Sequence, residues 1–105
     1  MYINEFAEKF YVTKREVQYW IDLGLIHPKK NENNNYQMFD DENEKEIKQV
    51  IIMKAAGFEL DLAHLGFFKL IPEDMWEDMI IGKIMDARFR ASRFYDEALR
   101  FAREQ

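Results

Sequence analysis

Long hydrogen-bond donors cluster at the start of a predicted short helix. Thr13 followed by Glu16 forms a capping box, in which each side chain can bond the backbone N–H of the other residue. Lys14, Arg15 and Gln18 follow on the first turns, and such side chains bind phosphates and base edges. This pattern predicts a helix that presents its N-terminal turns to a DNA groove.

A polar hairpin is predicted directly after this helix, which ends at Gly24. Lys29 and Lys30 lie on one arm, residues 33–35 form an asparagine turn, and residues 36–39 return. We assign Tyr19 to the groove-reading set, with packing in the core as the alternative. The predicted DNA-binding residues are Thr13, Lys14, Arg15, Gln18, Tyr19, Lys29, Lys30, Asn35, Tyr36 and Gln37.

Length and composition indicate one soluble globular domain. The chain has 105 residues, of which 48% are hydrophobic and 33% charged. There is no cysteine, which excludes disulfides and thiolate metal sites. No apolar run approaches the roughly 20 residues of a membrane span. We therefore expect a cytoplasmic protein that has no cofactor and does not contact a membrane.

The net charge of -5 argues against a simple nucleic-acid binder, because such domains are usually basic. However, residues 9–30 carry five cations against two acids. A basic face on an acidic protein predicts weak DNA binding with steep salt dependence, because few phosphates are neutralised.

Hydrophobic spacing predicts the elements around the capped helix. A first helix over residues 4–10 lies two residues before the Thr13 cap, as in a helix-turn-helix. Leu25 and Ile26 are expected to begin the first strand of the hairpin. A third helix is expected over residues 40–56. A fourth, over residues 59–71, is apolar on more than one face and is therefore expected to be buried.

Neither catalysis nor metal binding has a convincing set of residues. The acids that open the third helix are better explained as stabilisers of a helix N-terminus. Ser92 lies between arginines. The carboxylates near His27 and His64 in the sequence are better explained by structural roles than as partners in a metal or catalytic site. We therefore interpret His64 as structural and expect neither an enzyme nor a metal site.

Residues 72–105 predict one long helix that begins at Pro72 and is weakened only at Gly82. Its apolar seam is longer than the small preceding domain can cover, so a second chain is the expected partner. Residues 73–86 are net acidic and residues 87–105 net basic, which favours an antiparallel homodimer over a parallel one. The predicted dimer interface comprises Trp76, Met79, Ile80, Ile84, Ala87, Ala91, Phe94, Ala98 and Leu99, with Ala102 continuing the seam.

These predictions give a mainly α fold, a winged helix-turn-helix with a small β-hairpin wing (residues 1–71) followed by a dimerisation helix (residues 72–105). Several short motifs in this order resemble the N-terminal domain of the MerR family of bacterial transcription regulators. The motifs are Tyr2-Ile3, Glu5-Phe6-Ala7, Val12-Thr13, Val17, Tyr19-Trp20, Leu23-Gly24-Leu25-Ile26, Pro28, Tyr36, Phe39, Gly57-Phe58 and Leu60.

The resemblance implies a dimer on a pseudo-palindromic DNA site, with its second helices in successive major grooves and the DNA bent or untwisted. The family usually has arginine where this chain has Gln18 and Gln37, so two phosphate-binding charges are missing. Gln18 can still read adenine through two hydrogen bonds. No effector-binding domain is expected after the long helix.

Two functions remain open. The first is a DNA-binding transcriptional regulator without a ligand-sensing domain, from which a mobile-element excision factor cannot be separated by sequence. The alternative is a protein-interaction module that has kept the fold and lost DNA binding, with another regulatory protein as its partner. The two glutamines and the acidic balance motivate this alternative.

Overall fold

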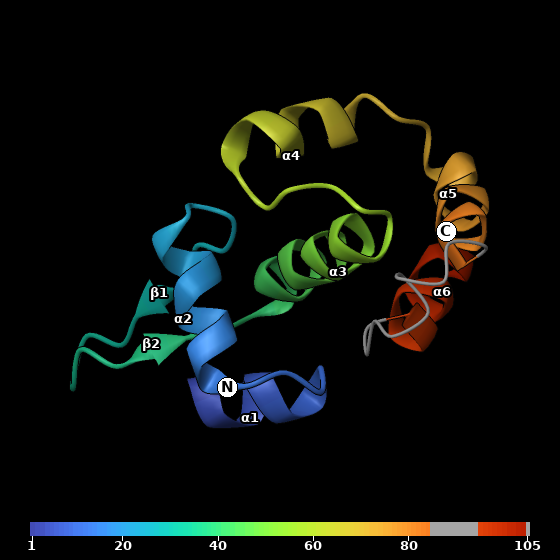
Figure 1. The fold of residues 1–105 in the computed structure, drawn as a ribbon. Helices are drawn as coiled ribbons and strands as arrows, with labels where there is room; N and C mark the ends of the chain where they lie inside the picture. The colour runs from blue at the N-terminus through green and yellow to red at the C-terminus, as the bar shows by residue number, and fades with distance from the viewer. Residues whose placement is uncertain (85–94, 105) are drawn as a thin grey trace. The chain divides into compact units, whose positions relative to one another are not determined.

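The computed structural model describes residues 1–84 and 95–104. In these ranges the fold is mainly helical, with one two-stranded antiparallel hairpin, as the winged helix-turn-helix prediction requires (Figure 1). The elements are α1 (Ile3–Lys9), α2 (Lys14–Asp22), β1 (Lys29–Lys30), β2 (Gln37–Met38), α3 (Asp41–Ala55), α4 (Leu62–Lys69), the 3₁₀ helix η1 (Glu73–Met75), α5 (Trp76–Ile84) and α6 (Tyr95–Arg103).

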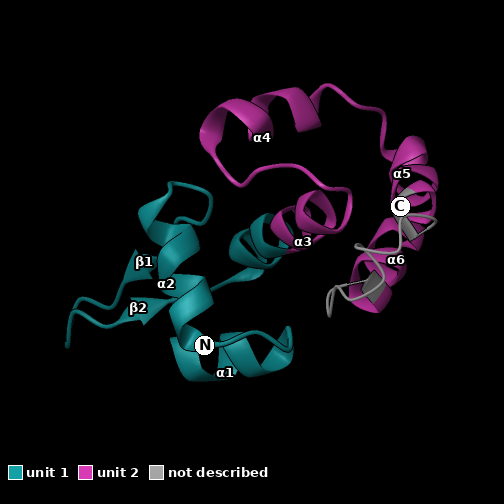
Figure 2. Cartoon of the chain, in the orientation of Figure 1, with its two compact units in different colours: residues 1–47 teal, residues 48–105 magenta. Residues whose placement is uncertain are grey.

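The chain forms two compact units, residues 1–47 and residues 48–105, and the division falls within α3 (Figure 2). The boundary that the sequence predicts after residue 71 stays a prediction. Among the described residues, no helix combines the length and the apolar character needed to cross a bilayer.

Aromatic side chains form the core of the first unit. Phe6 of α1 stacks on Phe39, with ring centroids 4.4 Å apart, and meets Phe10 edge to face. Val17 and Trp20 of α2 are also buried, so the apolar face of each short helix faces this core. Tertiary packing therefore stabilises helices that would be too short to persist alone.

The predicted start and end of α2 are confirmed. Thr13 and Glu16 form the complete capping box. Gly24 has a φ of 79°, the left-handed conformation that closes a helix at little cost without a Cβ. The predicted strand start at Leu25 and Ile26 is wrong, since β1 begins only at Lys29. Both side chains are buried, so they anchor the connection to the core instead of alternating across a strand.

A stack of aromatic rings connects elements of the second unit. Phe68 of α4 meets Phe58 edge to face and stacks on Trp76 of α5, with centroids 4.8 Å apart. The predicted fourth helix is shorter than expected, because Asp61 caps it and it ends at Lys69. The expectation that it is buried on several faces is wrong, since Leu62 and Phe67 are exposed.

Residues 72–105 differ from the single long helix that the sequence predicts. The Arg103 Nε of α6 lies 2.7 Å from the Glu77 Oε1 of α5. In one continuous helix these residues would be about 39 Å apart, so the chain folds back on itself. Ile80 and Ala98 are both fully buried. An apolar seam must be covered, and here helices of the same chain cover part of it.

Candidate nucleic-acid interface

The capping box positions the long donors of α2. The Glu16 backbone N–H donates to Thr13 Oγ1 over 3.1 Å, and the Thr13 N–H donates to Glu16 Oε1 over 3.0 Å. Because these bonds satisfy backbone groups at the first turn, the helix begins sharply at Lys14. Thr13 is thus occupied as a cap, which limits the part its hydroxyl can play in binding a ligand.

The predicted groove-reading residues lie on the exposed face of α2. Lys14 and Arg15 are exposed, and within the described part of the chain no carboxylate forms an ion pair with either. Gln18 Nε2 donates to Asp22 Oδ1 over 3.0 Å, which occupies part of its amide. Tyr19 is 58% exposed, so the alternative that it packs in the core is wrong.

Asparagine side chains build the turn of the wing, the hairpin of β1 and β2. Asn31 Oδ1 accepts from the backbone N–H of Asn33, and Asn34 Oδ1 accepts from that of Tyr36. Asn35 has a φ of 61°, a conformation that asparagine tolerates better than most residues. The predicted hairpin is confirmed, with Lys30 paired to Gln37 across an antiparallel ladder. Tyr36 follows the turn and is exposed.

The two wing lysines are in different electrostatic situations. Lys29 Nζ lies 3.3 Å from Asp40 Oδ2, so its ammonium group is engaged in an exposed ion pair. Lys30 is exposed on the same strand. The backbone N–H of Asn43, with further help from Lys29, lowers the pKa of Asp40 below its usual value. Asp40 therefore stays ionised and is a fixed anion beside the wing.

Asn43 of α3 joins the two ends of the wing. Its Nδ2 donates to the carbonyl oxygen of His27, before β1, over 2.9 Å. Its Oδ1 accepts from the backbone N–H of Asp40, after β2, over 2.9 Å. Its Nδ2 also donates to Glu46 Oε1, and Glu46 in turn accepts from the His27 backbone N–H. At 2% exposure, Asn43 is the buried polar residue of the described chain, and its bonds fix the position of the wing.

The N-terminal segment, Met1 and Tyr2, runs beside the second strand of the wing, β2. Met1 and Phe39 exchange two backbone hydrogen bonds of 2.8 and 3.0 Å. The ring of Tyr2 meets that of Tyr36 edge to face at 6.0 Å, and Asn34 Nδ2 donates weakly to the Tyr2 hydroxyl. This segment therefore supports the wing along its length.

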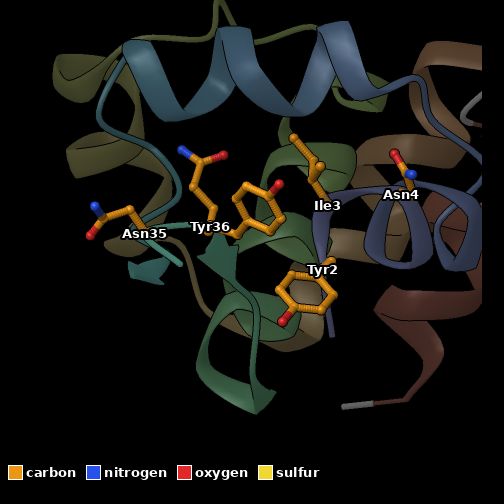
Figure 3. A pocket seen from close by; sticks show the side chains of 6 residues that line it. Tyr2, Ile3, Asn4, Asn35 and Tyr36 are labelled. Atoms are coloured by element: carbon orange, nitrogen blue, oxygen red, sulfur yellow. The ribbon is translucent and has the colours of Figure 1, made fainter. Parts of the chain in front are cut away.

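A cavity of about 570 Å³ lies between α1 and the wing (Figure 3). Ile3 and Asn4 come from the start of α1 and Asn35 from the turn, and the two tyrosine rings lie between them. The fold thus brings three predicted site residues together with three that the sequence did not indicate. The lining residues are Tyr2, Ile3, Asn4, Asn35, Tyr36 and Gln37.

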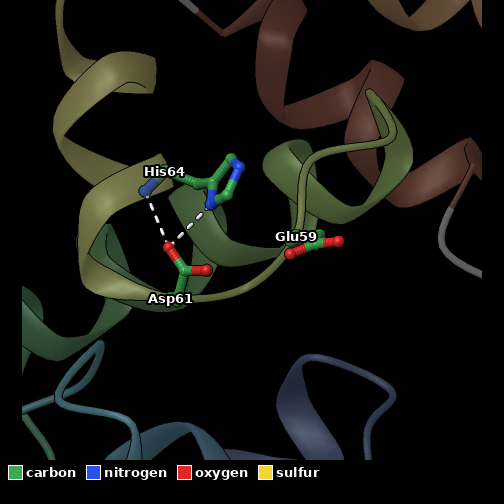
Figure 4. A group of neighbouring side chains, drawn as sticks. All are labelled: Glu59, Asp61 and His64. Atoms are coloured by element: carbon green, nitrogen blue, oxygen red, sulfur yellow. Dashed lines mark hydrogen bonds and ion pairs between the residues drawn. The ribbon is translucent and has the colours of Figure 1, made fainter.

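Glu59, Asp61 and His64 are the described side chains that could together hold a cation, with ligand atoms within 4.8 Å of one another (Figure 4). Asp61 Oδ1 already accepts from the His64 backbone N–H and lies 2.7 Å from His64 Nδ1. These contacts lower the pKa of Asp61, the backbone bond most strongly. Capping of α4 accounts for the pair, as expected for a structural histidine.

The predicted dimer residues fall into three groups. Trp76, Ile80, Ala98 and Leu99 are buried, and Ala102 is buried beside them. Met79 is half-buried. Ala87, Ala91 and Phe94, with the side chain of Ile84, lie outside the described residues. Their role between two chains stays a prediction.

Sequence reasoning missed Tyr2, Asn4 and Asn43 as parts of this site. A signal for Asn43 exists, because Asp40 followed three residues later by Asn43 resembles a capping box. Nothing local indicates the cavity, since its two walls are about 30 residues apart in the chain.

The model of the MerR HTH family of regulatory proteins matches residues 1–65. No curated protein and no solved structure matches the chain.

Proposed function

Because the chain belongs to the MerR HTH family of regulatory proteins, we propose that it is a homodimeric transcriptional regulator that binds a pseudo-palindromic site on double-stranded DNA. It acts in the cytoplasm and is not an enzyme. The exposed donor face of the capped helix α2 carries this proposal. Lys14 and Arg15 would contact phosphates or base edges. Tyr19, exposed on the same helix, would contact the DNA groove beside them.

The wing supports the same proposal. Lys30 and Asn35 are exposed at positions suited to contacts with the DNA backbone, and Tyr36 beside them is exposed as well. Lys29 would have to leave Asp40 before it could neutralise a phosphate. About three cations per protomer remain, so a dimer would show a log–log salt slope of about −5.

The test is selection from a randomised duplex pool at low salt, followed by affinity measurement at several salt concentrations. We expect an inverted repeat to be enriched and its affinity to fall steeply with salt. The variant Lys14→Ala/Arg15→Ala should lose this binding. Lys45→Ala/Lys54→Ala removes the same charge from α3 and should keep most of it, which separates the α2 contacts from net charge.

An interaction module without DNA binding is the second candidate. Gln18 and Gln37 stand where the family resemblance leads one to expect arginine, and the chain carries a net charge of -5. If no sequence is enriched at any salt concentration and both double variants behave alike, this second function replaces the first. An excision factor would enrich a site in the same experiment and would be recognised by the genomic position of that site.

A further inference from the structure

Helices α1, α2 and α3 end in the same way. Beyond each helix, one backbone N–H bonds the carbonyl oxygen three residues earlier, and the next N–H bonds the carbonyl oxygen five residues earlier. This is the Schellman arrangement, which satisfies carbonyl groups of the last turn and places one residue in the left-handed conformation. That residue is Tyr11 after α1, Gly24 after α2 and Gly57 after α3, with φ of 58°, 79° and 85°.

Tyr11 is the exception among these three residues. Glycine adopts a positive φ freely, whereas the Cβ of any other L residue comes too close to the following carbonyl oxygen. The other described residue that has a positive φ and is not glycine is Asn35, and asparagine tolerates this conformation better than most residues. Tyrosine lacks the short polar side chain of asparagine. Tyr11 therefore holds a strained backbone conformation that glycine would hold without strain.

Contacts within the chain do not explain this strain. The Tyr11 side chain is 67% exposed, and within the described residues it makes no hydrogen bond, ion pair or ring contact. The apolar contact that usually accompanies a Schellman arrangement belongs to the next residue, and here Val12 is buried. A strained residue whose side chain neither packs nor bonds within its own chain is a candidate for contact with a partner.

The position of Tyr11 indicates the class of that partner. Tyr11 lies on the link between α1 and α2, two residues before the Thr13 cap and three before Lys14. When a helix-turn-helix binds DNA, its first helix crosses the sugar–phosphate backbone and its second helix enters the major groove. The link between the two helices therefore passes close to the phosphates, and tyrosine is one of the side chains that donate hydrogen bonds to phosphate oxygens.

An uncharged donor suits this acidic chain. The net charge is -5, and Gln18 and Gln37 stand where the family resemblance leads one to expect arginine. Lys29 is engaged in an ion pair with Asp40. A phenol hydroxyl adds a bond to a phosphate without releasing a counterion, so its contribution persists at salt concentrations that weaken lysine contacts.

We propose that Tyr11 is a DNA-contacting residue, whose hydroxyl donates a hydrogen bond to a phosphate beside the groove that α2 enters. The contact offsets the backbone strain that the free protein carries. This inference rests on the proposed DNA binding, and it adds a residue that the sequence pattern did not indicate.

Two variants separate the strain from the contact. Tyr11→Gly removes both, whereas Tyr11→Phe removes the hydroxyl and keeps the strained side chain. In thermal melts without DNA, Tyr11→Gly should have a Tm about 2–5 °C above that of the natural protein. Tyr11→Phe should melt at the same temperature as the natural protein. An unchanged or lower Tm for Tyr11→Gly would remove the strain on which the inference is based.

Affinity is measured by fluorescence anisotropy on two duplexes, one of random sequence at low salt and one that carries the enriched site. Both variants should bind the enriched site about tenfold more weakly, from about threefold in each protomer of the proposed dimer. Binding to the random duplex should weaken by a similar factor, because phosphate contacts carry no sequence information. Natural affinity in Tyr11→Phe would overturn the proposed hydrogen bond.

Salt dependence identifies the kind of contact, with Lys14→Ala as the charged control. The log–log salt slope of both Tyr11 variants should equal that of the natural protein, because neither loses a charge. Lys14→Ala should reduce the slope by about 2 for a dimer. A slope reduced equally in the Tyr11 variants would mean that their weaker binding comes from displaced cations and not from the lost hydroxyl.

The outcomes also separate this inference from the function on which it rests. If the natural protein binds neither duplex, the proposed DNA binding fails and Tyr11 has no DNA to contact. If the natural protein binds DNA and both Tyr11 variants bind equally well, only the role of Tyr11 is refuted. Higher stability together with weaker binding in Tyr11→Gly is a combination that a purely structural residue would not give.

Discussion

The side-chain nitrogen of Asn43 donates a hydrogen bond to the carbonyl oxygen of His27 over 2.9 Å. The same side chain accepts from the backbone N–H of Asp40. One buried amide on α3 therefore holds both ends of the wing. Because the wing is short and has only two residues in each strand, its position depends on these bonds more than on its own ladder.

Asn43→Ala should destabilise the protein by about 1–3 kcal/mol, since it leaves the His27 carbonyl and the Asp40 N–H without their part-buried hydrogen bonds. Urea denaturation measures this change. DNA affinity should also fall, because the wing loses its fixed position. Gln49→Ala, a half-buried residue on the same helix, is the control. A stability equal to that of the control would mean that Asn43 does not hold the wing.

Gln18→Arg should increase DNA affinity, because it restores a phosphate-binding charge at the position where the family usually has arginine. With one added contact in each protomer, the log–log salt slope of a dimer should steepen by about 2. Fluorescence anisotropy at several salt concentrations measures both quantities. Gln49→Arg adds the same charge on α3 and should change the slope much less. Equal slopes for the two variants would place residue 18 away from the DNA.

The fold of residues 72–105 can be measured as a distance. Spin labels at Asp78 and Arg100, both exposed, would be about 33 Å apart in a continuous helix and leave the contact between Arg103 and Glu77 intact. We expect a much shorter distance within one chain, because Arg103 and Glu77 form an ion pair. Diluting labelled protein with unlabelled protein separates distances within a chain from those between chains. A distance near that of the continuous helix in the diluted sample would disprove the fold-back.

Asp40 should make stability dependent on pH in the acid range. Its pKa in the folded protein is lowered, chiefly by the backbone N–H of Asn43, from an ordinary value of 3.8. A lowered pKa contributes stability above the unfolded value, and this is lost as the pH falls through the folded value.

Asp40→Asn keeps a capping side chain and removes the charge. Its Tm should lie below that of the natural protein at neutral pH, and the difference should shrink below pH 3.8. Thermal melts between neutral and acid pH measure this. If the difference in Tm between the two proteins stays constant over that pH range, the loss of stability does not come from the charge of Asp40.

Local signals in the chain were enough to predict the DNA-binding half of the fold. The Thr13–Glu16 capping box and the positive φ at Gly24 depend on neighbouring residues, so their positions in the sequence specify where α2 begins and ends. The asparagine turn likewise builds its bonds within residues 31–36. Exposure of Lys14 and Arg15 followed from the period of the helix, because Val17 and Trp20 had to face the core.

Contacts between distant segments were beyond such reasoning. Tyr2 meets Tyr36 only because the N-terminal segment runs along the wing, and the cavity beside them has no local signature. An apolar stripe in the sequence predicts that this surface is buried. It does not identify the segment or the chain that buries it. The seam of residues 72–105 therefore fitted a second chain as well as it fitted a neighbouring helix of the same chain. For the described part of the seam, only tertiary packing shows that Ile80 and Ala98 are buried within one chain, and likewise that Leu62 and Phe67 of α4 are exposed.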